Sequence, residues 1–199
     1  VPPAAPRAAM KIIDRIRENQ RDGKTTISFE FFPAKTNKGV DNLLARIKQM
    51  SETLKPTFVT LTWRSAFKDE RLWLDIGRKV QVDMGVDILL HLTCHLPREA
   101  IRGILRRARE AGIQNILALR GDPPIGEDRW RPVEGGLSNA KELVALIREE
   151  HGDYFCIAVA GYPEAHIECW NSPDLPPSVQ SVALDRQRLK EKVDAGADF

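Results

Sequence analysis

The stretch LALRGDPP, residues 117–124, places an arginine and an aspartate two residues apart at the end of an apolar run. On a β-strand, side chains two residues apart point to the same side, so Arg120 and Asp122 would leave the strand together. Gly121 between them has no side chain and would let a ligand come close to the backbone. The pair could therefore belong to a ligand-binding site, or it could be an ion pair that stabilises the start of a loop.

Polar residues also close the other apolar runs of the sequence. One such residue has little weight, but five runs that end in the same way indicate a shared site. The residues concerned are Glu30, Thr62, His91, Thr93, Arg120, Asp122, Tyr162 and His166.

The pentapeptide HLTCH, residues 91–95, is a second candidate for chemistry, because His91, Cys94 and His95 are all possible zinc ligands. On a strand, however, residues 91 and 95 share one face while residue 94 points to the opposite face. The three side chains cannot converge on one ion without a turn. We therefore predict no metal site.

Five runs rich in β-branched and aromatic residues are predicted to be the strands that position these side chains. Several are almost continuously apolar, as expected for strands buried on both faces. Between them, apolar residues recur with helical spacing, and Asn139 with Glu142 resembles the capping box of a further helix. The predicted strands are 25–32, 57–63, 87–94, 115–121 and 154–161, and the predicted helices are 38–54, 97–111 and 140–150.

Glycines mark the point where each helix gives way to the next strand. They suit the left-handed conformation that ends many helices. Strand and helix therefore alternate, which implies parallel strands joined by right-handed crossovers. The glycines are Gly85, Gly112, Gly152 and Gly196.

Two architectures fit this alternation, an open doubly wound sheet and a (βα)8 TIM barrel. A nucleotide-binding open sheet usually carries G-x-G-x-x-G after its first strand, whereas here that strand runs into FFPAKTNKG, residues 31–39. A barrel requires polar residues at the carboxyl ends of several strands, which this sequence has. We therefore predict an α/β fold of the TIM-barrel type. Such a barrel takes about 250 residues, so we expect this chain to be truncated after strand five or at the start of strand six, at 197–199.

Composition and charge exclude several classes of protein. With 42% hydrophobic and 29% charged residues, one soluble globular domain is expected. The 30 basic residues barely exceed the 28 acidic ones, and no basic stripe is interleaved with aromatic residues, so no nucleic-acid partner is predicted. No apolar stretch reaches the ~20 residues of a membrane span, and the N-terminus lacks the apolar segment of a secretory signal. Cys94, Cys156 and Cys169 are odd in number and widely spaced, which indicates reduced thiols in a cytoplasmic protein.

In their order along the chain, six stretches resemble the methylenetetrahydrofolate reductase family. The resemblance runs from about Thr25 to the last residue, and two segments, 127–136 and 151–164, are closer to eukaryotic members, which carry a C-terminal regulatory domain. The six stretches are SFEFFPAKT (28–36), PTFVTLTW (56–63), HLTC (91–94), NILALRGDPP (115–124), VAGYPEAH (159–166) and LKEKVDAGADF (189–199).

The resemblance implies an N-terminal extension and helix over 1–24 and the first part of a flavin-dependent catalytic barrel over 25–199. The family reduces 5,10-methylenetetrahydrofolate to 5-methyltetrahydrofolate through bound FAD, with NADPH or NADH as the hydride donor. It implies a small-molecule folate substrate, no membrane partner and a homo-oligomer when the barrel is complete. The sequence leaves open which nicotinamide cofactor is used, and whether 199 residues are active alone.

Two carboxylates acquire roles from this resemblance. Glu30 matches the acid that helps to open the methylene bridge of the folate, which at neutral pH requires a raised pKa; Phe29, Phe31 and Phe32 could provide the apolar surroundings. A carboxylate paired inside the barrel is the alternative for Glu30. Asp122 matches a residue near the flavin and the pterin, where its charge would tune the flavin potential and its oxygens would accept hydrogen bonds from the pterin.

The resemblance also assigns the FAD contacts. Arg120 and Lys192 are the groups expected to hold the pyrophosphate, since no Rossmann loop is present. The matched positions are Thr62, His91, Leu119, Arg120, Gly121, Asp122, Ala160, Tyr162, His166, Asp185 and Lys192.

Two other functions fit the same barrel pattern. One is a flavin-free, folate-dependent methyltransferase, which would be colourless where a flavoprotein is yellow. The other is a truncated, non-catalytic barrel that only binds partners, which a turnover assay would separate from an enzyme.

Overall fold

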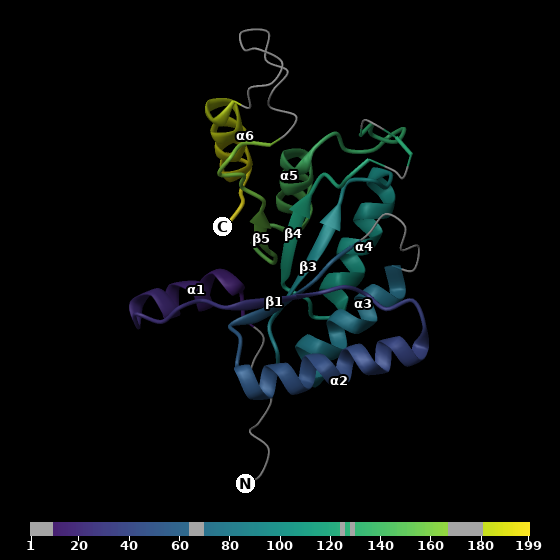
Figure 1. Cartoon of the computed structure of the whole chain (residues 1–199). Coiled ribbons are helices and arrows are strands. Elements are labelled where there is room, and N and C mark those ends of the chain that lie inside the picture. Colours follow the sequence, from purple (N-terminus) through teal and green to yellow (C-terminus); the bar gives the residue numbers. More distant parts are fainter. Residues whose placement is uncertain (1–9, 64–69, 124–125, 128–129, 167–180) are drawn as a thin grey trace.

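The computed structural model describes residues 10–63, 70–123, 126–127, 130–166 and 181–199. Five parallel strands form one sheet in the order β1-β2-β3-β4-β5 (Figure 1). A doubly wound sheet reverses its strand order at a switch point, so this sequential order is the one that TIM-barrel strands have, and the predicted α/β fold is confirmed. The strands are β1 (Ser28–Phe31), β2 (Phe58–Leu61), β3 (Ile88–Thr93), β4 (Asn115–Leu119) and β5 (Cys156–Val159).

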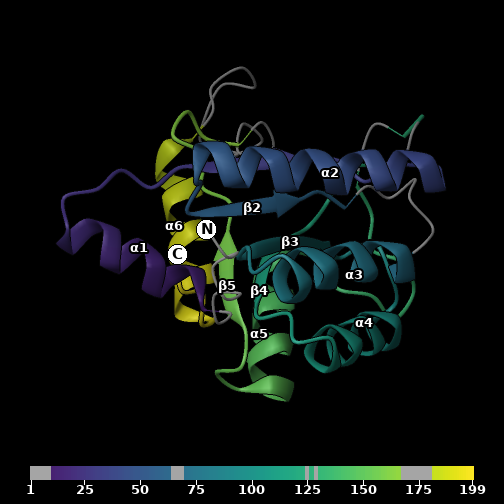
Figure 2. The ribbon, with the colours of Figure 1, turned by 90° about the horizontal axis from the view of Figure 1, so that it is seen from below.

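The helices form an arc around the strands, from α2 through α3 and α4 to α5 (Figure 2). The predicted helices over 38–54, 97–111 and 140–150 are confirmed to within one residue, and the four predicted glycines all have positive φ. None of the described helices is long and apolar enough to cross a bilayer. The helices are α1 (Ile12–Arg21), α2 (Asn37–Leu54), α3 (Glu70–Arg78), α4 (Arg98–Glu110), α5 (Ala140–His151) and α6 (Val182–Asp194), with a π-helical turn η1 (Lys79–Asp83) after α3.

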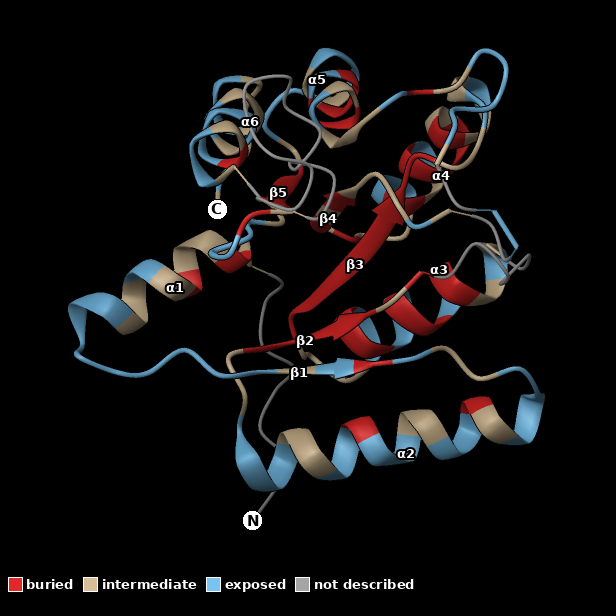
Figure 3. Ribbon diagram, turned by 45° about the horizontal axis from the view of Figure 1, so that its top comes forward, coloured by how far each residue is buried: buried red, intermediate tan, exposed pale blue. Residues whose placement is uncertain are grey.

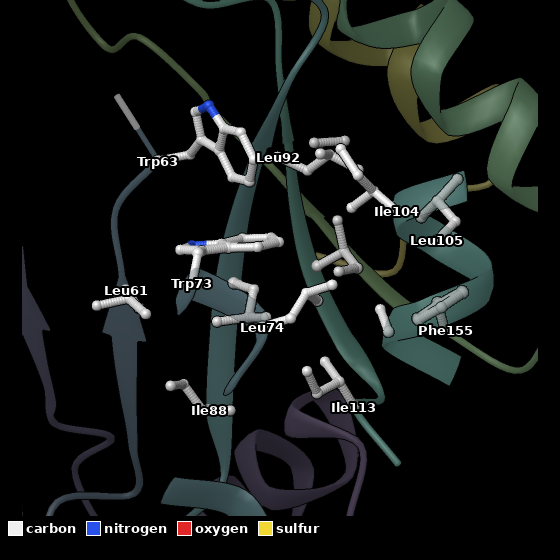
Figure 4. Packing of buried hydrophobic residues seen from close by; sticks show 14 of the residues in the cluster. Leu61, Trp63, Trp73, Leu74, Ile88, Leu92, Ile104, Leu105, Ile113 and Phe155 are labelled. Carbon is white, nitrogen blue, oxygen red and sulfur yellow. The ribbon is translucent and has the colours of Figure 1, made fainter. Parts of the chain in front are cut away.

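The larger core lies between the helices and the outer face of the sheet. Strands β2 and β3 are buried along their whole length (Figure 3). Their alternate residues, such as Leu61 and Leu92, point into this core and are fully buried (Figure 4). Trp73 of α3 is also fully buried, and its ring meets the edge of Trp63 with centroids 4.6 Å apart. This packing fixes the helices against the strands whose carboxyl ends carry the polar residues.

A second, smaller cluster fills the inner face of the sheet near the amino ends of the strands. Phe58, Leu89 and Ala158 point inward there. Ile12 of α1, fully buried, covers them, and Phe199 packs at the side. Figure 2, which looks at the molecule from below, shows α1 lying across this end. Helix α1 therefore covers the end of the sheet opposite the predicted site.

Hydrogen bonds between buried polar groups hold α1 against the sheet. Asp87, just before β3, accepts hydrogen bonds from the Nε of Arg15 (2.9 Å) and the backbone N–H of Met10 (3.1 Å). Asn115 at the start of β4 accepts from the backbone N–H of Ile12 at 2.8 Å. The Arg15 and Asp87 side chains are 7% and 5% exposed. Since buried charges need a partner, this pair is a single structural unit.

The last two residues of the chain run along the free edge of β5. The backbone N–H of Asp198 donates to the carbonyl of Ile157 at 2.7 Å, and the N–H of Val159 donates to the carbonyl of Phe199 at 2.9 Å. This is the position in which the sequence predicts a sixth strand to begin.

The capping box predicted for α5 is present. The Asn139 side chain accepts from the backbone N–H of Glu142 at 3.0 Å, and the Glu142 carboxylate accepts from the backbone N–H of Ser138 at 2.8 Å. We expect Asn139→Ala to lower the free energy of unfolding by about 1 kcal/mol, because one helix N–H loses its acceptor. Chemical denaturation measures this, with Asn139→Ser as a control that keeps an N-cap acceptor; equal stability of Asn139→Ala and Asn139→Ser would contradict it.

Candidate functional site

A cavity of about 890 Å³ opens at the carboxyl ends of the strands. The structure brings all the residues predicted to contact the cofactor to the wall of this one cavity, although their roles remain predictions. They come from the ends of β2, β3, β4 and β5, from the segment after β5, and from α6. The residues are Thr62, His91, Leu119, Arg120, Gly121, Asp122, Ala160, Tyr162, His166, Asp185 and Lys192.

Glu30 lies on the inner face of the sheet beside two of these residues. In the parallel register Glu30 pairs with Thr60, and the hydroxyl of Thr62 donates to Glu30 Oε1 at 2.7 Å. His91 Nδ1 is 4.0 Å from the same oxygen. Burial lowers the pKa of His91, and the nearby Glu30 carboxylate partly opposes this shift. The imidazole is therefore neutral at neutral pH, and the carboxylate has one close hydroxyl donor.

The apolar surroundings predicted for Glu30 are not the ones found. Phe29 and Phe31 alternate with Glu30 along β1 and pack on the opposite face, in the core under the helices. Phe32 is 53% exposed, and the Glu30 side chain is 52% exposed. Neighbours in sequence point to opposite faces of a strand, so this prediction was wrong.

Strand β4 ends at Leu119, and Gly121 has a φ of +97°. The backbone that carries Arg120 and Asp122 is therefore not extended. The two-residue period therefore does not extend over Arg120 and Asp122, yet both line the cavity. The Arg120 guanidinium lies 5.5 Å from the ring centroid of Trp130. A Cβ at position 121 would come within 3.2 Å of the Thr93 Cβ, so glycine permits this close approach.

The HLTCH segment does not gather its three possible ligands. Cys94 points away from His91 into the outer core, where its thiol donates to the carbonyl of Leu119 at 3.1 Å. Burial raises the pKa of the Cys94 thiol to about 12. Within the described ranges, no three histidine, cysteine or carboxylate side chains are grouped as metal ligands would be.

The sequence reasoning missed several residues of the cavity wall. Trp63 and His95 follow β2 and β3, while Ser138–Lys141 span the N-cap and the first residues of α5. A helix that follows a barrel strand begins at the site end, and its N-terminal N–H groups favour anions. The capping box at Asn139 was the signal that could have placed this helix start at the site.

Helix α6 supplies the remaining wall. Lys192 Nζ donates to the carbonyl of Ala160 at 2.6 Å and lies 5.9 Å from the ring centroid of Tyr162. The Tyr162 and His166 rings meet edge to face at 4.7 Å. Asp185 also lines the wall and is 6% exposed. The cavity thus combines cationic groups near the start of α5 and on α6 with aromatic and aliphatic surface.

Comparison with known proteins identifies the family of this chain. Residues 15–199 match the family described as methylenetetrahydrofolate reductase. Methylenetetrahydrofolate reductase (NADH) 1 of Arabidopsis thaliana is 46% identical over 193 residues, which are 96% of this chain and 32% of the relative. Methylenetetrahydrofolate reductase 2 of Saccharomyces cerevisiae is 43% identical over 193 residues, which are 96% of this chain and 31% of the relative.

A probable methylenetetrahydrofolate reductase (NADPH) of Caenorhabditis elegans is 33% identical over 192 residues, 94% of this chain and 27% of the relative. The chain thus spans about a third of the length of these curated relatives. Since the family match covers nearly the whole chain, the chain belongs to the methylenetetrahydrofolate reductase family.

Proposed function

We propose that this chain forms part of a flavoenzyme that reduces 5,10-methylenetetrahydrofolate to 5-methyltetrahydrofolate with NADH or NADPH as the hydride donor. The observation that carries the proposal is the single cavity around which the matched residues gather. Relatives whose names carry either nicotinamide cofactor are similar to this chain, so the proposal includes both.

The chemistry of the cavity wall fits FAD. A pyrophosphate needs cations and N–H donors, and Arg120 and Lys192 lie on the wall together with the N-terminus of α5. A flavin ring needs a flat apolar surface, which Leu119 and Ala160 offer between the ends of β4 and β5. Bound FAD would supply the capacity to accept and pass on a hydride. The protein's part is to hold and orient the ring and to manage protons and charge beside it.

Glu30 is the proposed acid of the reaction, because protonation of the folate opens its five-membered ring. The hydroxyl of Thr62 fixes Glu30 Oε1, which leaves the second carboxyl oxygen to meet the substrate. Asp122 stands on the cavity wall after β4. Its proposed role is to accept hydrogen bonds from the pterin and to tune the flavin potential by its charge.

The proposal also includes a cytoplasmic location and a homo-oligomer. Cys94 and Cys156 are buried free thiols, which agrees with a reducing compartment.

FAD binding is the direct test of this function. Protein expressed from the full coding sequence is expected to be purified yellow, with an absorbance band at about 450 nm from non-covalently bound FAD. Heat denaturation should release the flavin into the supernatant. Colourless protein that also fails to take up added FAD would refute the proposal and would favour a flavin-free methyltransferase.

A further inference from the structure

Three side chains on one side of the cavity form a hydrogen-bonded chain to which the proposed chemistry gives no role. The indole Nε1 of Trp63, after β2, donates to His95 Nε2 at 3.3 Å. The other ring nitrogen, His95 Nδ1, is hydrogen bonded to the hydroxyl of Thr93 at the end of β3. All three residues line the cavity. These hydrogen bonds thus link the carboxyl ends of β2 and β3.

The donor and the acceptor in each of these hydrogen bonds follow from the indole of Trp63. An indole N–H can only donate, so His95 Nε2 must be the acceptor and cannot carry a proton. Burial lowers the pKa of His95, which favours the neutral ring at neutral pH. A neutral ring whose Nε2 is unprotonated carries its proton on Nδ1. His95 therefore donates to Thr93, and the Thr93 oxygen is the acceptor.

The proton of the Thr93 hydroxyl then needs a different acceptor. Within the described part of the chain, the Thr93 hydroxyl has hydrogen-bond contact with His95 alone. Thr93 pairs with Leu119 in the sheet, and both line the cavity. The close approach of Gly121 to the Thr93 Cβ restricts the side chain from the other side. The remaining direction for the proton is into the cavity.

We propose that Trp63 and His95 are positioning residues that hold the Thr93 hydroxyl as a hydrogen-bond donor to the molecule bound in the cavity. The acceptor is a carbonyl oxygen or an unprotonated ring nitrogen of a heteroaromatic ligand. This inference rests on the proposed function in one respect, namely that the ligand is the flavin ring of FAD. The direction of the hydrogen bonds depends on the protein alone.

Nitrogen NMR of the imidazole rings tests that direction without any ligand. In the full-length protein, His95 is expected to be neutral, with its proton on Nδ1. Trp63→Phe removes the indole donor and should shift the proton toward Nε2, the nitrogen that imidazole rings in water prefer. Trp73→Phe is the matched control, because Trp73 packs against Trp63 but its Nε1 has no hydrogen-bond partner among the described residues. A wild-type ring protonated on Nε2 would overturn the proposal.

Titration with FAD tests the Thr93 donor. Thr93→Val keeps the shape and removes the hydroxyl, and it should weaken FAD binding about 5- to 10-fold, the effect of one lost hydrogen bond. Thr93→Ser should restore most of the affinity, which a purely structural role for the residue would not predict. If Thr93→Val fails to fold, Trp63→Phe provides the same test and should weaken binding by a smaller factor while Trp73→Phe leaves it unchanged.

The outcomes separate this inference from the proposed function. Wild-type affinity of Thr93→Val for FAD would overturn the donor while the flavoenzyme stands. A wild-type protein that binds no FAD would refute the flavoenzyme and would overturn the flavin as the acceptor, whatever ring tautomer NMR reports.

Discussion

Glu30→Gln, in the full-length protein, is expected to keep its FAD and its reduction by NADH or NADPH while its reduction of methylenetetrahydrofolate falls at least about 10²-fold. Hydride transfer from the nicotinamide to bound flavin delivers no proton to folate. Opening the five-membered ring of the folate does require one. Loss of a single acid should therefore affect one half-reaction and spare the other.

The surroundings of Glu30 make glutamine a clean replacement. The Thr62 hydroxyl donates to Glu30 Oε1, and the carbonyl oxygen of a glutamine can accept the same bond. The side chain is half exposed, at 52%, so the substitution buries no unpaired amide. The variant thus removes the acid with little change in shape or in stability.

Stopped-flow absorbance can follow the two half-reactions separately. Glu52→Gln is the matched control, because Glu52 is exposed near the C-terminal end of α2 and is not among the residues that line the cavity. If the folate half-reaction of Glu30→Gln kept its wild-type rate, or if both half-reactions slowed equally, Glu30 would be a structural carboxylate. That is the alternative that the sequence left open.

The strands and three of the six described α-helices, α2, α4 and α5, could be predicted because their signals are local. Residues of β3 are buried on both faces, and four of the six residues in Ile88–Thr93 are therefore apolar, with His91 and Thr93 as the exceptions. The observed strands are shorter than the predicted runs because ladder pairing with both neighbours, and not composition, sets where a strand ends. The π-helical turn Lys79–Asp83 has no comparable signal in the sequence.

Site residues could be predicted where a polar residue at the end of a single strand was enough to identify them. Thr62, His91 and Arg120 were found in this way, and the cavity unites them. Contacts between elements were not predictable from spacing, which is why the link between Trp63 and His95 was missed. The wrong surroundings for Glu30 have the same origin, since Phe29 and Phe31 are its neighbours in sequence and not in space.

Asp87→Asn is expected to lower the free energy of unfolding by about 3–5 kcal/mol, a large loss for a conservative change. Asp87 faces Arg15 across a 2.9 Å ion pair whose side chains are 7% and 5% exposed. An amide in its place leaves the buried guanidinium with one counter-charge, the partly exposed Glu18 carboxylate 3.4 Å from its Nη1. The two carboxylate oxygens of Asp87 accept from Arg15 and from the Met10 backbone N–H. In asparagine, the NH2 group replaces one of these oxygens and would face a donor.

We expect Asp87→Asn to affect the cavity only by unfolding the protein. Helix α1 covers the inner cluster at the opposite end of the sheet from the cavity, and Asp87 is one of two buried anchors that hold it. We therefore expect Asp87→Asn to unfold at lower denaturant, and to bind FAD with wild-type affinity while it is folded. Weakened FAD binding at low denaturant would instead show that α1 is coupled to the site.

Two further variants separate the buried charge from the loss of any ion pair. Asp83→Asn breaks a pair with Arg78 whose side chains are 48% and 44% exposed, and it should cost about 0–1 kcal/mol, because exposed pairs contribute little. Arg15→Met combined with Asp87→Asn removes the stranded guanidinium and should recover part of the stability lost by Asp87→Asn alone. If Asp87→Asn is no more destabilising than Asp83→Asn, Glu18 or water compensates the charge of Arg15, and the buried pair is not what holds α1 on the sheet.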